Sequence, residues 1–78
     1  MREAIDEAVL KALMDGRGIS DFLVTRVNDG FGLSVRYTSS ARWLPIRSRR
    51  EPVRTWASLS AVGKYLERLG VREFRVEL

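Results

Sequence analysis

Residues 21–37 read DFLVTRVNDGFGLSVRY, and the expected fold class depends most on this stretch. Residues 21–27 are rich in β-branched and aromatic side chains, which favour a strand. The following Asn28-Asp29-Gly30 is a tight-turn sequence, because Asn and Gly tolerate positive φ. In residues 31–38, apolar side chains alternate with Gly, Ser, Arg and Thr, so one face of the returning strand should be buried and the other wet. The stretch therefore predicts a β-hairpin.

Two helices are predicted, one on each side of this hairpin. The first covers residues 2–15, where apolar residues recur at helical spacing, and Gly16 is expected to end it in the left-handed conformation. The second covers residues 59–69, with Ser58 as its N-cap and Gly70 as its stop.

Two more strands complete the prediction. Residues 43–47 form a third strand, and Pro45 places it at an edge or a bulge because proline has no N–H. Residues 74–78 alternate apolar and charged side chains, so we expect a final strand that pairs inside the sheet. The order is α-β-β-(β)-α-β. It predicts a two-layer α+β fold with both helices on one face of a mostly antiparallel sheet.

Length and composition restrict the function classes. Seventy-eight residues form one domain, spanning residues 1–78. The chain has neither cysteine nor histidine, so disulfides, thiolate chemistry, the usual general base and the commonest zinc ligands are all missing. We expect no enzyme activity, no cofactor and no metal. No apolar run approaches the length of a membrane span or a signal-peptide core, so we expect a cytoplasmic protein without membrane contact.

The positive charge is concentrated in residues 42–54. This segment holds five arginines and one acid, while the rest of the chain holds nine basic and nine acidic side chains that cancel. Arginine binds carboxylate or phosphate through a planar fork, and tryptophan offers a face for stacking. The candidate partner-binding residues are therefore Arg42, Trp43, Arg47, Arg49, Arg50 and Arg54.

A structural interpretation of the same residues stays open. The arginines can form a solvated loop that keeps the protein in solution, and Trp56, which stands just before the second helix, can belong to the core. The candidate partners of a basic surface are a phosphate backbone and an acidic protein surface. The chain has no helix-turn-helix, zinc finger or aromatic RNA-binding motif, which favours a protein partner.

The C-terminal half resembles short accessory proteins carried by plasmids, integrative elements and phages, some of them partition-associated. The resemblance rests on RREPVRTWASL at residues 49–59 and on the residues that follow it, which are Val62, Tyr65-Leu66, Leu69-Gly70-Val71 and Phe74-Arg75-Val76. Within that group, a compact basic domain without enzyme chemistry is similar to the anti-CRISPR proteins. This resemblance implies binding to a CRISPR effector protein subunit and carries over no functional residue.

Two functions follow as expectations. The first is an inhibitor that binds a type I CRISPR effector complex, Cascade, and blocks its engagement with target DNA. The alternative is a plasmid partition or maintenance accessory protein that binds DNA or a partner protein. The sequence leaves open whether the chain is a monomer or a homodimer, because a domain this small gains stability from a second copy.

Overall fold

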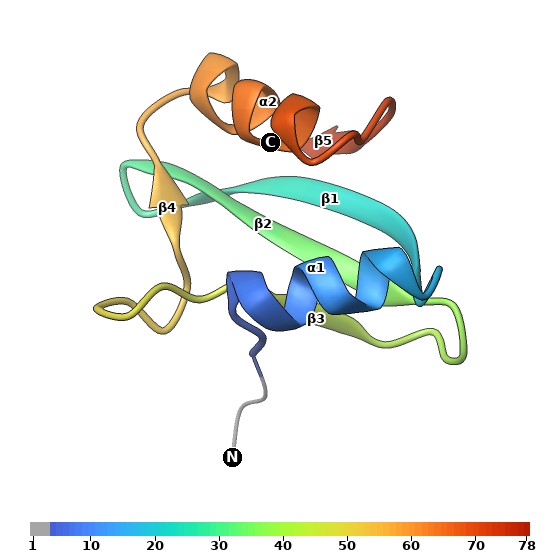
Figure 1. Ribbon diagram of the computed structural model, residues 1–78. Coiled ribbons are helices and arrows are strands. Elements are labelled where there is room, and N and C mark those ends of the chain that lie inside the picture. Colours follow the sequence, from blue (N-terminus) through green and yellow to red (C-terminus); the bar gives the residue numbers. More distant parts are fainter. Residues whose placement is uncertain (1–3) are drawn as a thin grey trace.

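The computed structural model describes residues 4–78 and shows a small α+β fold (Figure 1). Its elements, in chain order, are α1 (Glu7–Asp15), β1 (Ile19–Val27), β2 (Gly30–Tyr37), β3 (Trp43–Pro45), β4 (Thr55–Trp56), α2 (Leu59–Arg68) and β5 (Arg75–Glu77). The predicted fold class and order of elements are confirmed. The short strand β4 was not predicted.

The five strands form one mixed sheet. Four of them follow the order β3-β2-β1-β5, and β4 pairs with β2 beside this path. The pairings β1–β2, β2–β3 and β2–β4 are antiparallel, while β5 runs parallel to β1. The expected mostly antiparallel sheet is therefore confirmed. The last strand joins the sheet, as predicted, but the expectation that it pairs inside the sheet is wrong, because β5 lies at the edge and pairs only with β1.

The hairpin of β1 and β2 is the centre of the sheet. Val24 lies opposite Leu33, and both are almost fully buried. Asn28 has the positive φ that the turn needs, at 52°. The alternation predicted for the returning strand holds from Leu33 to Arg36, since Leu33 and Val35 are buried whereas Ser34 and Arg36 are partly exposed. It is wrong at Gly32, which was expected on the wet face and is buried beside Val27 and Val53.

Helix α1 begins later than the sequence predicts. Asp6 is its N-cap, and the carboxylate of Asp6 accepts a hydrogen bond of 2.9 Å from the Val9 N–H. The preceding Ile5 is extended: it forms a parallel bridge with Ile46, and its N–H donates to the Pro45 carbonyl at 3.1 Å. The helix predicted over residues 2–15 is thus wrong for residues 4–6, and residues 2 and 3 lie outside the described chain. The pairing of Ile5 with Ile46, which is distant in the sequence, determines where α1 begins.

The helix ends differ in how well the sequence predicts them. Gly16 has φ of −88°, so the predicted left-handed C-cap there is wrong; Arg17 takes the positive φ instead, at 59°. In α2, Ser58 is the predicted N-cap and accepts a hydrogen bond of 3.1 Å from the Ala61 N–H. Gly70 follows with φ of 88°, as predicted.

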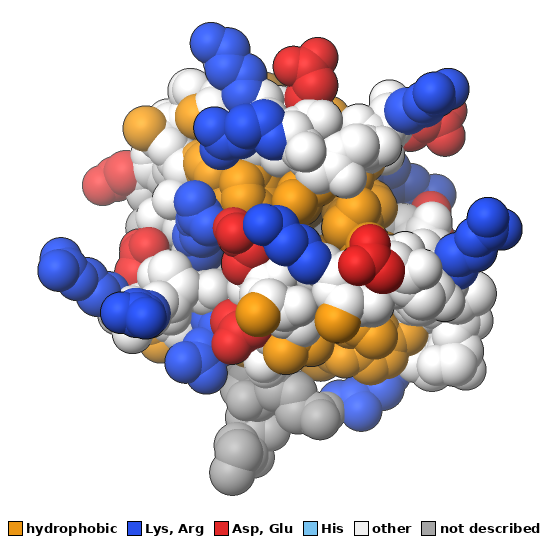
Figure 2. All heavy atoms as spheres, in the orientation of Figure 1, with side chains coloured by type: hydrophobic (Ala, Val, Ile, Leu, Met, Phe, Trp, Pro, Cys, Tyr) orange, Lys and Arg blue, Asp and Glu red, His pale blue; other side chains and the backbone are white. Residues whose placement is uncertain are grey.

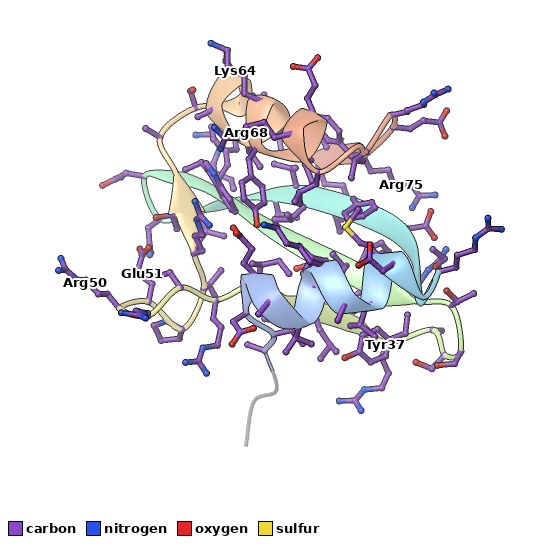
Figure 3. The ribbon with its side chains drawn as sticks, viewed as in Figure 1. Tyr37, Arg50, Glu51, Lys64, Arg68 and Arg75 are labelled. Carbon is purple, nitrogen blue, oxygen red and sulfur yellow. The ribbon has the colours of Figure 1, made fainter. Side chains whose placement is uncertain are left out.

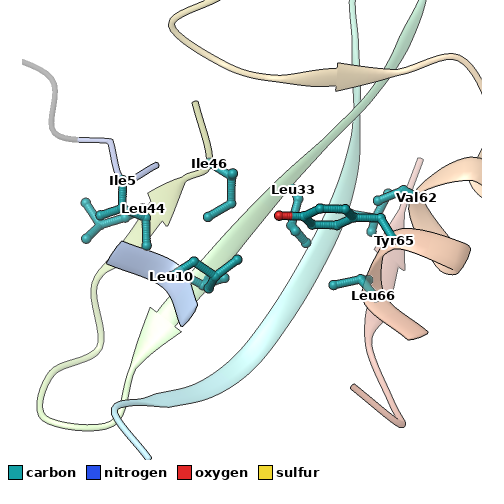
Figure 4. Packing of buried hydrophobic residues seen from close by; sticks show 10 residues of the cluster. Ile5, Leu10, Leu33, Leu44, Ile46, Val62, Tyr65 and Leu66 are labelled. Atoms are coloured by element: carbon teal, nitrogen blue, oxygen red, sulfur yellow. The ribbon is translucent and has the colours of Figure 1, made fainter. Parts of the chain in front are cut away.

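Both helices pack on one face of the sheet and share one hydrophobic core (Figure 4). Leu10 of α1 and Leu66 of α2 are completely buried in it. The other buried members come from the sheet, from the segment around Ile5 and from α2: Ile5, Val24, Leu33, Val35, Leu44, Ile46, Val62 and Tyr65. Neither α1 nor α2, the two helices of the described residues, has the length and hydrophobicity of a membrane-spanning helix.

Candidate binding site

The candidate site is the arginine loop, which we define as residues 47–52 with sequence RSRREP. Two short backbone contacts close its base, because the Arg47 N–H donates to the Ile5 carbonyl at 2.9 Å and the Arg54 N–H donates to the Ile46 carbonyl at 2.8 Å. The loop therefore leaves the sheet and returns to it at one fixed position. In Figure 1 it projects beyond the sheet to the left of α1.

The tip of the arginine loop is a hydrogen-bonded turn. The Ser48 N–H donates to the Glu51 carbonyl at 3.1 Å, and the Glu51 N–H donates to the Ser48 hydroxyl at 3.1 Å. The Glu51 carboxylate accepts a hydrogen bond of 3.0 Å from the Thr55 hydroxyl. Reciprocal bonds of this kind fix a loop without a hydrophobic core of its own. Arg49 and Arg50 occupy the centre of the turn.

Three loop arginines carry a charge that no described side chain neutralises. Arg47, Arg49 and Arg50 are exposed. Among residues 4–78, none of their side chains forms an ion pair. Figure 3 shows Arg50 extending from the loop, away from both helices. These guanidinium groups are available to an external anion.

The same three arginines border a groove of about 600 Å³. Its apolar part includes Tyr37, Leu44 and Pro52. Guanidinium forks around an aromatic and aliphatic floor suit a ligand surface that combines negative charge with apolar contact, because each arginine can hold a carboxylate or phosphate through two bonds.

Arg50 reaches a second groove on the other side of the loop. This groove has a volume of about 770 Å³ and lies between the arginine loop and the β1–β2 turn. Asn28 and Asp29 of that turn line it, together with Val53. Of the three loop arginines, Arg50 is the one that borders both grooves, and Glu51 and Pro52 beside it line both as well.

Arg54 lies apart from the loop tip, inside a cluster between the two helices. Its guanidinium carbon is 4.7 Å from the Trp56 ring centroid and 4.8 Å from that of Tyr65. Its Nη1 lies 3.5 Å from Oε1 of Glu7. An arginine held between two aromatic rings and a carboxylate is a packing residue. The structure therefore separates Arg54 from the other candidate partner-binding residues.

This cluster changes the acidity of two of its members. The hydrogen bond from the Tyr65 hydroxyl, supported by Lys11 and Arg54, lowers the pKa of Glu7 below its ordinary value. Burial, and then the Glu7 carboxylate, raise the pKa of Tyr65 to about 12. Both shifts favour the observed pair of a charged Glu7 and a protonated Tyr65, so the cluster is a stable connection between α1 and α2.

Trp43 and Arg42 also lie away from the groove. Trp43 alternates with Leu44 along β3, so its ring is on the opposite face of the sheet. There the Arg36 guanidinium lies 5.2 Å from the Trp43 ring centroid and also pairs with Asp21. Arg42 is exposed at the start of β3, and its N–H donates to the Ser40 hydroxyl at 3.4 Å.

The six candidate residues thus divide into three places, and only Arg47, Arg49 and Arg50 come together. Figure 2 agrees with this division, since Lys and Arg side chains are spread over the visible face rather than gathered in one patch. Tyr37 is a groove residue that the sequence did not indicate as functional. Its position at the end of an alternating strand marks it as core, and only the approach of the arginine loop makes it part of a groove.

Within residues 4–78, no group of three His, Cys, Asp or Glu side chains lies close enough to hold a metal ion. Comparison of the chain with family models, with curated proteins and with solved structures finds no match. The candidate function therefore depends on the chemistry of the arginine loop and on the resemblance of the C-terminal half.

Proposed function

We propose that this protein is a stoichiometric inhibitor that docks its arginine loop on a negatively charged surface of a type I CRISPR effector complex and blocks target DNA engagement. The observation that supports the docking surface is a group of three exposed arginines, with no ion-pair partner among residues 4–78, on a loop closed at its base. The resemblance to anti-CRISPR proteins supports the class of target.

The hydrogen bonds of the loop support a binding role because they reduce the entropy lost on docking. An unordered loop must be fixed when it binds, which costs affinity for each immobilised residue. In the arginine loop, Ser48 and Glu51 already hold the turn. Docking through Arg49 and Arg50 then loses less conformational entropy, so more of the energy of their contacts contributes to affinity.

The sign of the charge restricts the mode of inhibition. A protein that imitates DNA must present negative charge, whereas this loop presents three guanidinium groups and one carboxylate that is hydrogen-bonded to Thr55. The proposed inhibitor therefore binds an acidic protein surface, or the nucleic acid already held by the complex, and excludes target DNA by occupying space.

The test compares two triple variants with equal charge change. In the loop variant, Arg47, Arg49 and Arg50 become Glu; in the control, the exposed Lys64, Arg68 and Arg72 on and after α2 become Glu. Lys64 and Arg68 lie far from Arg50 in Figure 3. Binding to an immobilised, purified type I effector complex is measured for each. At about 1 kcal/mol for each lost contact, the loop variant should bind roughly 100-fold more weakly, and the control should bind within roughly threefold of wild type.

Equal binding by both triple variants would remove the arginine loop from the mechanism. A parallel gel shift with duplex DNA, over a salt series, tests the alternative partition or maintenance function. Direct DNA binding gives a complex whose affinity falls steeply as salt rises. The inhibitor should shift no DNA without its protein target, so a salt-sensitive shift by the protein alone would contradict the proposal.

A further inference from the structure

The strand β5 forms an open edge of the sheet. It pairs with β1 on one side, through Leu23↔Arg75, Val24↔Val76 and Thr25↔Glu77, and it is the last strand in the sheet order. Within residues 4–78 no strand pairs with its other side, which therefore presents N–H and C=O groups to which another strand can bond. The opposite border of the sheet is partly covered, because Ile5 forms a bridge with Ile46 and bonds to the last residue of β3, Pro45.

The apolar side chains around β5 are exposed to an unusual degree. Phe74 is 38% exposed, Val76 42% and Leu78 81%. Val76 pairs with Val24, which is completely buried on the face that the helices cover. Val76 remains accessible because no strand of residues 4–78 lies beyond it. Within residues 4–78, the apolar side chains of this edge are therefore only partly covered on the face that carries the core.

The two charged residues of β5 lie on the opposite face. Arg75 is a register partner of Leu23 and Glu77 of Thr25, so both charges project from the face without helices. Arg75 is attracted by the nearby Asp21, whose direct partner is Arg36. Within residues 4–78, Glu77 forms no ion pair.

We propose that β5 pairs with β5 of a second copy of this chain, antiparallel and centred on Val76. In this register Val76 faces Val76 of the other copy, Arg75 faces Glu77 and Phe74 faces Leu78. The sequence FRVEL is self-complementary about its central residue: apolar meets apolar and positive meets negative at every position. Opposite charges directly across an antiparallel pair stabilise it.

This symmetry favours a second copy over an unrelated strand. A twofold dimer requires one surface to complement itself, so that each residue that contacts another is contacted by it in return. Two Arg75–Glu77 pairs and one Val76 pair satisfy that requirement without any other change. The pairing joins two five-stranded sheets and covers Val76 and Leu78, which are exposed in the single chain. The arginine loop takes no part in this pairing and stays accessible in both copies.

The test is a charge-swap series followed by sedimentation over a concentration range. Glu77→Arg places two arginine pairs across the dyad, and Arg75→Glu places two glutamate pairs there. Each variant alone should raise the dimer dissociation constant by roughly tenfold or more. An equimolar mixture of the two variants restores opposite charges at both positions and should form a heterodimer with near wild-type affinity. Glu67→Arg, an equal charge change on α2, is the control and should leave the dimer intact.

The mixture distinguishes the proposal from loss of folding, because a variant that cannot fold cannot be rescued by its partner. Wild-type protein that sediments as a monomer up to millimolar concentration would overturn the proposal. So would a dimer that persists in Glu77→Arg, or single-variant monomers that stay monomers when mixed. Each result is independent of whether the arginine loop binds its target.

Discussion

The Tyr65 hydroxyl donates a hydrogen bond of 2.9 Å to Oε1 of Glu7, and this bond joins α1 to α2 across 58 positions of the sequence. Tyr65 is buried, at 3% exposure, while Glu7 is partly open to solvent. The same carboxylate oxygen lies 3.5 Å from Arg54. One acidic side chain thus connects both helices to the segment that precedes β4.

Replacement of Tyr65 by Phe should destabilise the protein by about 1–2 kcal/mol, because a buried hydroxyl that bonds a carboxylate is lost while the ring is kept. Chemical denaturation at neutral pH measures the change. Tyr37→Phe is the matched control, since its hydroxyl has no partner within residues 4–78 and its loss should cost under about 0.5 kcal/mol. Equal costs for the two variants would mean that the Glu7–Tyr65 bond adds no stability.

The protein should lose stability in acid because the Glu7 carboxylate becomes protonated. The pKa of Glu7 is lowered in the folded protein from an ordinary value of 4.5, so its contribution is complete above pH 4.5 and is lost as the pH drops below that value. Glu7→Gln should remove part of this acid dependence. Denaturation midpoints between pH 7 and 3 measure it, and identical pH profiles for Glu7→Gln and wild type would contradict the expectation.

Stability should also fall in alkali through Tyr65. The folded protein keeps the Tyr65 proton up to a pKa of about 12, whereas the unfolded chain releases it near 10.0. The unfolded state is therefore favoured increasingly as the pH rises from 10 to about 12. In Tyr65→Phe the free energy of unfolding should depend less on pH in this range, whereas Tyr37→Phe should keep the wild-type dependence. Urea titrations at pH 8, 10 and 11 give the comparison.

Arg54 and Arg50 should respond differently to the same substitution. Arg54→Lys keeps the charge but loses the planar group held between Trp56 and Tyr65, so it should cost about 1–2 kcal/mol of stability. Arg50→Lys removes no hydrogen bond, ion pair or ring contact within residues 4–78 and should change stability by less than about 0.5 kcal/mol. Thermal unfolding of both variants in one buffer decides whether the two arginines have separate roles.

Two glycines offer a matched test of the β4 pairing. A Cβ atom at Gly30 would lie 2.5 Å from the Trp56 carbonyl oxygen, so Gly30→Ala must displace β4 and should cost about 2 kcal/mol or more. A Cβ atom at Gly63 in α2 meets nothing closer than Phe74 at 3.9 Å. Gly63→Ala should stabilise the protein by about 0.5–1 kcal/mol through helix propensity. Similar melting temperatures for both variants would contradict the tight approach at Gly30.

The parts of the fold that local sequence specifies are the parts that could be predicted. Helix α2 has a cap at Ser58, a helical repeat and a stop at Gly70, all within thirteen residues. The hairpin has its alternation and its turn. Each signal comes from neighbours in the chain, so no distant contact is needed to read it.

The parts that distant contacts specify could not be predicted. Helix α1 begins at Glu7 because Ile5 pairs with Ile46, 41 positions further on. Strand β4 is only two residues long and exists through its pairing with β2. At the candidate site, the sequence gives no reason to treat Arg50 and Arg54 differently. The structure places them in different environments because Arg54 bonds to Glu7, which lies 47 positions before it.

The bridge between Ile5 and Ile46 has a consequence for assembly. Ile5 bonds to the Pro45 carbonyl and to the Arg47 N–H, so these two backbone groups are not open to a strand of another molecule. In the proposed pairing, β5 of each copy is occupied by β5 of the other, so this contact closes at two chains and does not continue into a filament.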